Sequence, residues 1–244
     1  MATIVCCSGI MRSASTWSYN VCRELAVRAA TRRSEALALG FSNDTDRTLA
    51  GWLRQARERD LVMRGVMKAH VIGPRTRAGI ARGRVGNVFT IRDPRDAMAS
   101  MLLFGQEKSE AEKSDLIEAY RQVLDQGLAF LDDGHSLVVR YEEMVGDPRT
   151  QIRTIARYLH TQVTQADIAA IDAATGTRNA AAVVARLEAE AEPGVDHFDA
   201  VTNLHVSHLH GGIVGRWRRE LSPEFAARLQ EAFGPYLQAY GYQP

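Results

Sequence analysis

Short apolar runs alternate with amphipathic segments through the first 140 residues of the chain. The runs are rich in β-branched residues, as in Val85 to Ile91, and have the length of buried strands. The segments between them repeat apolar residues at the spacing of one helix face; the first carries Trp17, Val21, Leu25 and Ala29. The expected strands occupy residues 3–7, 37–42, 61–67, 85–91 and 137–139, and the expected helices include 17–29, 44–57, 109–131 and one beginning at Pro94. Strands alternating with helices form βαβ units, so the pattern predicts an α/β fold with a central parallel β-sheet flanked by helices.

The last hundred residues are mostly helical in pattern. Helical spacing begins at Pro148 and recurs at 166–173, 180–191, 223–233 and 236–240. Residues 193–212 contain one proline, three glycines and four histidines with weak periodicity, so a long loop is expected there. No internal repeat or linker-like stretch interrupts the chain, and residues 1–244 are therefore expected to form a single domain.

The segment after the first strand has the composition of a phosphate-binding loop. Residues from Ser8 to Thr16 are mostly small or polar, with Arg12 as the one cation. Loop amides and a helix N-terminus together direct positive charge at an anion. Ala14 and Ser15 replace the second glycine and the lysine of the nucleotide-binding pattern G-x-x-x-x-G-K-[ST]. Taken alone, the segment fits a phosphate site and an ordinary strand–turn–helix junction about equally well.

The charge of the chain is unevenly distributed. The net charge is +1 over 244 residues, yet residues 1–100 carry 17 Lys/Arg against 8 Asp/Glu, and the remainder carries 13 against 21. A basic first part suits an anionic ligand. No basic stripe is interleaved with aromatic residues, so nucleic acid is not expected as a partner.

The three cysteines and the absence of long apolar stretches bear on location. Cys6, Cys7 and Cys22 are odd in number and lie in apolar surroundings, which argues against a disulfide framework and for a reducing compartment. The N-terminus lacks a signal-like pattern, and no run of about 18 apolar residues exists. A cytoplasmic protein without a membrane partner is expected.

Two motifs resemble the nucleotide site of the sulfotransferases that use 3′-phosphoadenosine 5′-phosphosulfate (PAPS). Residues 12–17 resemble the 5′-phosphosulfate loop [KR]-[SAT]-G-[ST]-[ST]-W, and only Ala14 departs from it. Arg92 to Asp96, followed by Ser100, resembles the 3′-phosphate site R-[DN]-P-[RK]-D with a serine eight residues after the arginine. An arginine at a strand end can fork onto a phosphate to which the serine hydroxyl also donates. The resemblance implies PAPS as donor, 3′,5′-phosphoadenosine (PAP) as product, and binding by Arg12, Ser13, Ala14, Ser15, Thr16, Trp17, Arg92 and Ser100.

Three further segments fit the same family. Lys68-Ala69-His70 resembles K-x-H, which implies His70 as the general base and Lys68, with Arg12, as cations at the transferring group. Tyr141 begins a segment that resembles Y-E-[DE]-[LM], which implies a place beside the adenine. Residues 210–217 resemble R-K-G-x-x-G-D-W. The resemblance there implies that His210, Gly211 and Gly212 lie at the 3′-phosphate, and Arg216 stands where the family has aspartate.

The resemblance implies a P-loop-like fold and transfer of a sulfuryl group to a hydroxyl, or as a second choice an amine, of a small molecule. Two alternatives stay open: a small-molecule kinase with a degenerate loop, and a nucleotide-binding protein without catalysis. No cysteine or clear carboxylate set accompanies the four histidines of 193–212, so a loop covering the acceptor site is preferred over a metal site. The family's K-x-x-x-T-V-x-x-x-E dimer motif is absent, which leaves the oligomeric state open.

Overall fold

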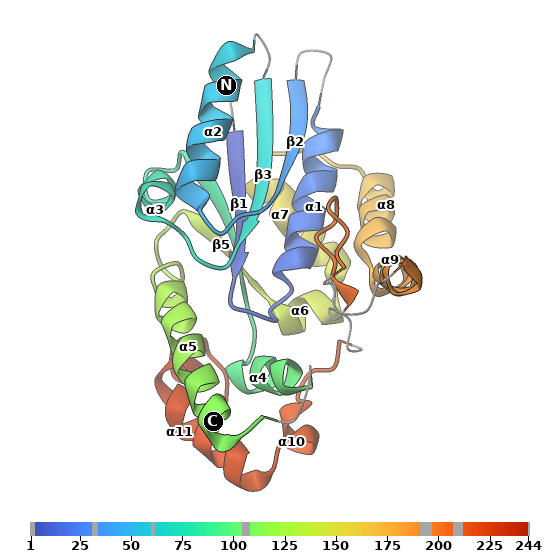
Figure 1. Ribbon diagram of the computed structural model, residues 1–244. Coiled ribbons are helices and arrows are strands. Elements are labelled where there is room, and N and C mark those ends of the chain that lie inside the picture. Colours follow the sequence, from blue (N-terminus) through green and yellow to red (C-terminus); the bar gives the residue numbers. More distant parts are fainter. Residues whose placement is uncertain are drawn as a thin grey trace.

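Five parallel strands form the centre of the molecule (Figure 1). The computed structural model describes residues 3–30, 34–59, 62–103, 108–190, 197–206 and 212–243. The strand order is β2-β3-β1-β4-β5, and every neighbouring pair is parallel. The strands are β1 (Thr3–Gly9), β2 (Ser34–Phe41), β3 (Val62–Ala69), β4 (Val85–Ile91) and β5 (Ser136–Arg140). The predicted α/β fold with a parallel sheet is confirmed.

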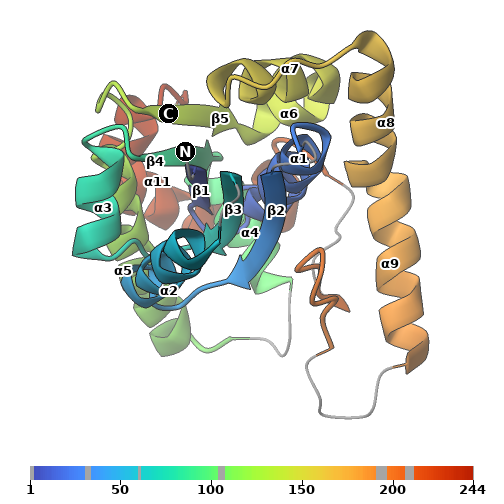
Figure 2. The same cartoon turned by 90° about the horizontal axis from the view of Figure 1, so that it is seen from above.

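Helices cover both faces of this sheet (Figure 2). Successive residues of a strand point to opposite faces, so Cys6 packs into one core cluster and Cys7 into the other. The Cys6 face is covered by α2 (Thr45–Glu58), α3 (Pro74–Ile80), α5 (Glu110–Leu128) and α11 (Pro223–Ala239). The Cys7 face is covered by α1 (Ser15–Arg28), α7 (Pro148–Tyr158) and α8 (Gln165–Thr175), and α9 (Thr177–Glu190) follows α8. This double cover explains the continuous apolar character of β1.

Three short helices lie beyond the carboxyl ends of the strands, below the arrowheads in Figure 1. They are α4 (Pro94–Leu102), α6 (Tyr141–Gly146) and α10 (Trp217–Glu220). The Asp93 side chain accepts a hydrogen bond from the Arg95 amide and so caps α4, as Asp44 caps α2 through the Arg47 amide. These caps fix where the chain turns from strand into helix at the edge where a ligand is expected.

The structure differs from the sequence-based expectations at several elements. Helices α6 and α10 were not expected, and β2 begins three residues earlier than its apolar run. The two expected closing helices form one, since Pro235 lies inside α11. Proline lacks an N–H and removes one helical hydrogen bond, but buried Phe233 and Leu237 on either side hold the helix in place. In the described residues, no helix is long and apolar enough to cross a membrane.

Candidate active site

The loop between β1 and α1 is shaped by its packing on the end of β4. The Ser13 hydroxyl is buried, donates to the Ile10 carbonyl at 2.5 Å and lies 2.7 Å from the Thr90 hydroxyl. A side chain at Gly9 would place its Cβ 2.0 Å from that same hydroxyl, so only glycine fits there. Ser13 therefore serves the shape of the loop, and its hydroxyl is already in use.

The first turn of α1 faces this loop without a side-chain cap. Ala14 is the N-cap residue, and its methyl group accepts no hydrogen bond. The first backbone bond of the helix runs from the Ser18 amide to the Ala14 carbonyl. The amides of Ser15, Thr16 and Trp17 thus lie in the uncapped turn, where the partial positive charge of a 14-residue helix favours an anion.

Arg12 connects this loop to the second motif. Its Nε donates to the Ser100 hydroxyl at 3.2 Å, across 88 residues of sequence. Burial, chiefly, and the nearby positive charge of Arg92 lower the pKa of Arg12 to about 10. A guanidinium that is partly desolvated and faces another cation is stabilised by any anion that enters between them.

Arg92 lies at the centre of the converging segments. It is 3% exposed, donates to the Arg12 carbonyl at 3.2 Å and to the Ile213 carbonyl at 3.0 Å, and its Cζ lies 4.0 Å from the centroid of the Tyr141 ring. Its Nε is buried and has no hydrogen-bond partner among the described residues. An orphaned buried donor on a cation is costly, and a bound anion would satisfy it.

The carboxylate of Asp96 fastens the C-terminal segment to α4. It accepts hydrogen bonds from the Gly215 amide at 2.6 Å and the Trp217 amide at 3.0 Å. Gly212 has a φ of +63°, and a Cβ there would lie 3.8 Å from the Tyr141 hydroxyl. Residues 210 and 211, which were also expected at this point, lie outside the described residues.

Lys68 is a buried cation at the end of β3. It is 4% exposed, and its Nζ lies 5.5 Å from the centroid of the Phe41 ring. Burial, chiefly, and the neighbouring Arg12 charge lower the pKa of Lys68 to about 8. No carboxylate in the described part of the chain pairs with it.

His70 follows on the same side, two residues along the strand. Its Nδ1 lies 3.0 Å from the Gly9 carbonyl oxygen. A carbonyl can only accept, so Nδ1 carries the proton, and Nε2 bears the lone pair of the neutral ring. Burial, chiefly, and the Lys68 charge lower the pKa of His70, while the bond to Gly9 acts in the opposite direction. The neutral ring is therefore the dominant form at neutral pH.

Sequence reasoning missed the residues that hold these groups in place. Gln126 on α5 donates to the His70 carbonyl at 2.9 Å and accepts from the Ile72 amide at 2.9 Å. Tyr120 on the same helix donates to the Met11 carbonyl at 3.0 Å. Both positions fit an amphipathic helix in the sequence, and nothing in the spacing distinguishes them.

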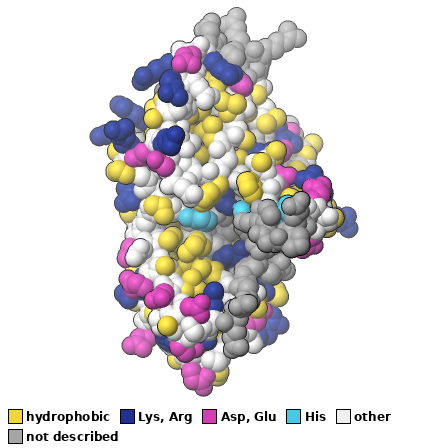
Figure 3. All heavy atoms as spheres, viewed as in Figure 1, with side chains coloured by type: hydrophobic (Ala, Val, Ile, Leu, Met, Phe, Trp, Pro, Cys, Tyr) yellow, Lys and Arg dark blue, Asp and Glu magenta, His cyan; other side chains and the backbone are white. Residues whose placement is uncertain are grey.

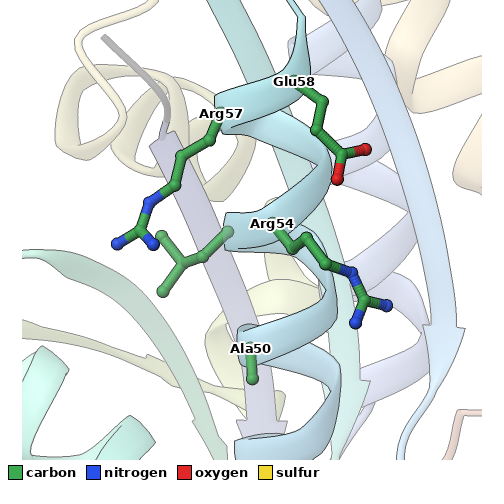
Figure 4. A pocket seen from close by; sticks show the side chains of 5 residues that line it. Ala50, Arg54, Arg57 and Glu58 are labelled. Carbon is green, nitrogen blue, oxygen red and sulfur yellow. The ribbon is translucent and has the colours of Figure 1, made fainter.

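The face around His70 is hydrophobic. The rings of His70 and Phe41 lie 5.7 Å apart, and Phe41 is 44% exposed. In the view of Figure 3, histidine side chains lie near the middle of the molecule with hydrophobic atoms next to them. A shallow depression elsewhere is lined by Ala50, Leu53, Arg54, Arg57 and Glu58, whose side chains extend outward from α2 (Figure 4). This depression lies on the C-terminal half of α2, which leads to the amino end of β3, away from this site.

Comparisons with known proteins agree with the geometry. A family model described as a sulfotransferase domain matches residues 54–241. Among solved structures, the mouse sulfotransferase SULT7A1 complexed with PAP superposes with a TM-score of 0.67 at 14% identity, covering 97% of this chain and 84% of that one. Retinol dehydratase with retinol and PAP gives 0.63 at 15% identity, covering 96% and 81%. Among curated protein sequences, none matches this chain.

The solved structures and the family match establish different properties of the chain. Structures at this level of identity establish the fold. The family match covers more than half of the chain and contains the Lys68, Arg92 and Tyr141 segments, although it begins after the first loop. The chain therefore belongs to the sulfotransferase family, whose reaction is the transfer of a sulfuryl group.

Proposed function

We propose that this chain transfers a sulfuryl group from PAPS to the hydroxyl, or as a second choice the amine, of a small molecule, with His70 as general base. One observation carries the choice of donor. Arg12, Arg92 and Ser100 converge from separate segments, and the buried Nε of Arg92 has no partner among the described residues. Together with the uncapped first turn of α1, this group offers two places for an anion, which suits a nucleotide with phosphate groups on both its 3′ and 5′ oxygens. The solved sulfotransferase and retinol dehydratase structures were obtained with PAP, which supports the same donor class here.

The binding roles follow from the contacts of each group. Arg12 and the amides of residues 15–17 hold the 5′ end, and Arg92 with Ser100 holds the 3′-phosphate. Tyr141 stacks on the Arg92 guanidinium and presents its ring beside the site, where an adenine edge fits. Gly212 lies beside Tyr141 and offers its amide. His210 and Gly211 stay predictions from the sequence.

The catalytic roles depend on where charge changes. PAPS supplies the activated sulfuryl group. The Nε2 of His70 accepts the proton of the acceptor hydroxyl, because Gly9 holds the other ring nitrogen in its protonated form. Lys68 and Arg12 hold positive charge beside the place where negative charge develops, and their burial strengthens that effect.

The acceptor side is proposed to be enclosed by the 193–212 segment. Within its described part, residues 197–206 dock on α1 through a hydrogen bond from Asn20 Nδ2 to the Thr202 carbonyl at 2.8 Å. Phe198 and His205 form an antiparallel bridge and stack with ring centroids 5.3 Å apart. An ordered segment beside the hydrophobic face near Phe41 would exclude water from the acceptor.

Calorimetry tests the donor and the role of Arg92 together. Arg92→Ala should weaken PAP binding by about 2–4 kcal/mol, because it removes a buried charge-assisted phosphate contact. Binding of AMP, which lacks the 3′-phosphate, should change much less. The matched control is Arg84→Ala, an exposed arginine just before β4, which should leave both affinities unchanged.

Three outcomes would contradict the proposal. Equal losses for PAP and AMP would remove Arg92 from the 3′-phosphate. A wild-type protein that binds ATP with magnesium but not PAP would favour a kinase. Tight PAP binding without turnover on any hydroxyl or amine would favour a non-catalytic nucleotide-binding protein.

A further inference from the structure

Phe41, at the end of β2, contacts both proposed catalytic groups of β3 but has no role in the proposed mechanism. The centroid of its ring lies 5.5 Å from the Lys68 Nζ and 5.7 Å from the centroid of the His70 ring. The side chain belongs to neither core cluster of the described residues and is 44% exposed. Core packing therefore does not explain where this ring lies.

A β-bulge in β2 brings Phe41 next to Lys68. The register between β2 and β3 shifts between Ala38 and Gly40, so Leu39 is an extra residue in β2, and Phe41 is paired with Lys68. Without the extra residue, Phe41 would lie one position further along β3, and its side chain would point to the opposite face of the sheet. The bulge thus directs the ring toward the cation.

The backbone on both sides of Phe41 is fixed. Gly40 has a φ of +71°, and a Cβ there would meet nothing within 4 Å, so the position favours glycine for its backbone rather than for lack of space. On the other side, the Ser42 amide donates to the Lys68 carbonyl at 2.8 Å. The Ser42 hydroxyl lies 2.7 Å from the Thr48 hydroxyl on α2. These contacts hold the end of β2 against β3 and against the helix that follows.

The Lys68 ammonium group has no other stabilising partner in the described part of the chain. The residue is 4% exposed, and neither an ion pair nor a hydrogen bond of its Nζ is found there. The neighbouring charge of Arg12 is repulsive. The Cys7 thiol and the His70 ring are neutral because burial, chiefly, raises the pKa of the first and lowers that of the second. An aromatic face within about 6 Å attracts a cation, and more strongly where water is scarce.

We propose that Phe41 is a positioning residue, whose ring holds the Lys68 ammonium group beside His70 through a cation–π contact. The inference rests on the proposed function, because Lys68 and His70 are the groups that carry that reaction. The contact keeps Lys68 charged and fixes its place next to the base. It also gives the bulge at Gly40 a purpose, since bulges beside active sites often redirect a side chain.

NMR titration of the full chain tests this contact without nucleotide or acceptor. The sequence contains three lysines, Lys68, Lys108 and Lys113, so ¹³C labelling of the lysine Cε atoms gives three resonances, and Lys68→Arg identifies the one of interest. Phe41→Met keeps an apolar side chain but removes the ring, and should lower the midpoint of the Lys68 titration by about 0.5–1 pH unit. Phe41→Trp should keep or raise that midpoint, because an indole ring binds cations best.

Two controls separate the ring from general changes in the protein. The midpoints of Lys108 and Lys113 should stay constant in every variant. Leu39→Met alters the same strand at a side chain that packs into the core cluster of the other sheet face, and should leave the Lys68 midpoint unchanged.

The assignment is overturned if Phe41→Met leaves the Lys68 midpoint unchanged or raises it, since the ring would then only shield the amine from water. It is also overturned if Phe41→Trp lowers the midpoint as far as Phe41→Met does. Calorimetry with PAP on the same wild-type sample tests the proposed function separately. A protein that shows the expected midpoints but does not bind PAP would support the Phe41–Lys68 contact and refute the donor.

Discussion

The protonation states of His70 and Lys68 determine how the proposed reaction responds to pH. The pKa of His70 is lowered, so the ring is neutral and basic at neutral pH and becomes protonated only below its ordinary value of about 6.5. The pKa of Lys68 is lowered to about 8, so its positive charge is lost as the pH rises through that value. Acid pH therefore removes the basic form of His70, and alkaline pH removes the positive charge of Lys68.

We therefore expect a bell-shaped profile of kcat/KM against pH, with an acid limb below about 6.5 and an alkaline limb near 8. Lys68→Arg should move the alkaline limb upward, because a guanidinium stays charged there. His70→Ala should lower turnover by about 10²-fold or more and abolish the acid limb, with nucleotide affinity nearly unchanged. An acid limb that persists in His70→Ala would assign it to another group.

At the scale of elements, α5 holds the end of β3 in position. Gln126 bridges the His70 carbonyl and the Ile72 amide, so the backbone on both sides of Val71 is tied to one helix. The His70 ring is tied separately to β1 through Gly9. In the proposed mechanism Gln126 is a positioning residue, which acts on the proposed base His70 through the backbone.

Gln126→Leu should lower kcat about 10–100-fold, because small displacements of a catalytic group are costly. The affinity for PAP should stay within about twofold, since α5 contacts no phosphate group in the proposed site. Gln122→Leu, an exposed position one turn earlier on α5, is the control and should leave kcat unchanged. If Gln126→Leu loses PAP affinity instead of kcat, its effect does not run through His70.

Most elements could be predicted because their apolar spacing and caps are local features. The edge at which Arg12, Lys68 and Arg92 meet was also predictable, because parallel strands bring the residues after their ends together. Helix α6 was missed because its six residues are too few for a period and begin directly at the end of β5. Gln126 and Asp96 were missed because their roles arise only from contacts between distant segments.

Ala14, the N-cap residue of α1, is the position at which the first loop differs from the family motif. It departs from the glycine of the family loop, and the structure gives it a left-handed backbone with φ of 72°. A non-glycine residue there costs about 1–2 kcal/mol, which glycine would avoid. The sequence shows that alanine replaces the family's glycine at position 14. The structure adds that this alanine has a conformational cost, because its backbone is left-handed, besides the space that its methyl group takes.

At the scale of the whole molecule, Tyr242 and Gln243, here called the tail, connect two strand–helix junctions. These are the β4–α4 junction and the β5–α6 junction, which flank the proposed 3′-phosphate site. The Tyr242 hydroxyl donates to Glu142 at 2.9 Å, and the other oxygen of Glu142 accepts from the Asp93 amide at 3.1 Å. Asp93 directly follows Arg92, so the tail, α6 and α4 form one continuous chain of contacts. Arg95 adds a second link by donating to the Gln243 carbonyl at 2.6 Å.

This arrangement predicts that the tail sets the affinity for the 3′-phosphate without contacting it. Tyr242→Phe deletes one hydrogen bond to Glu142 and should weaken PAP binding about 2–10-fold, the range of one net hydrogen bond, while AMP binding stays constant. The matched control is Tyr236→Phe, which removes a hydroxyl bond from α11 to Asp125 and has no link to Asp93. It should lower the midpoint of urea unfolding but leave the ratio of PAP to AMP affinity unchanged. If both variants change that ratio equally, the tail acts through general stability, and the path from Tyr242 to Arg92 carries no specific coupling.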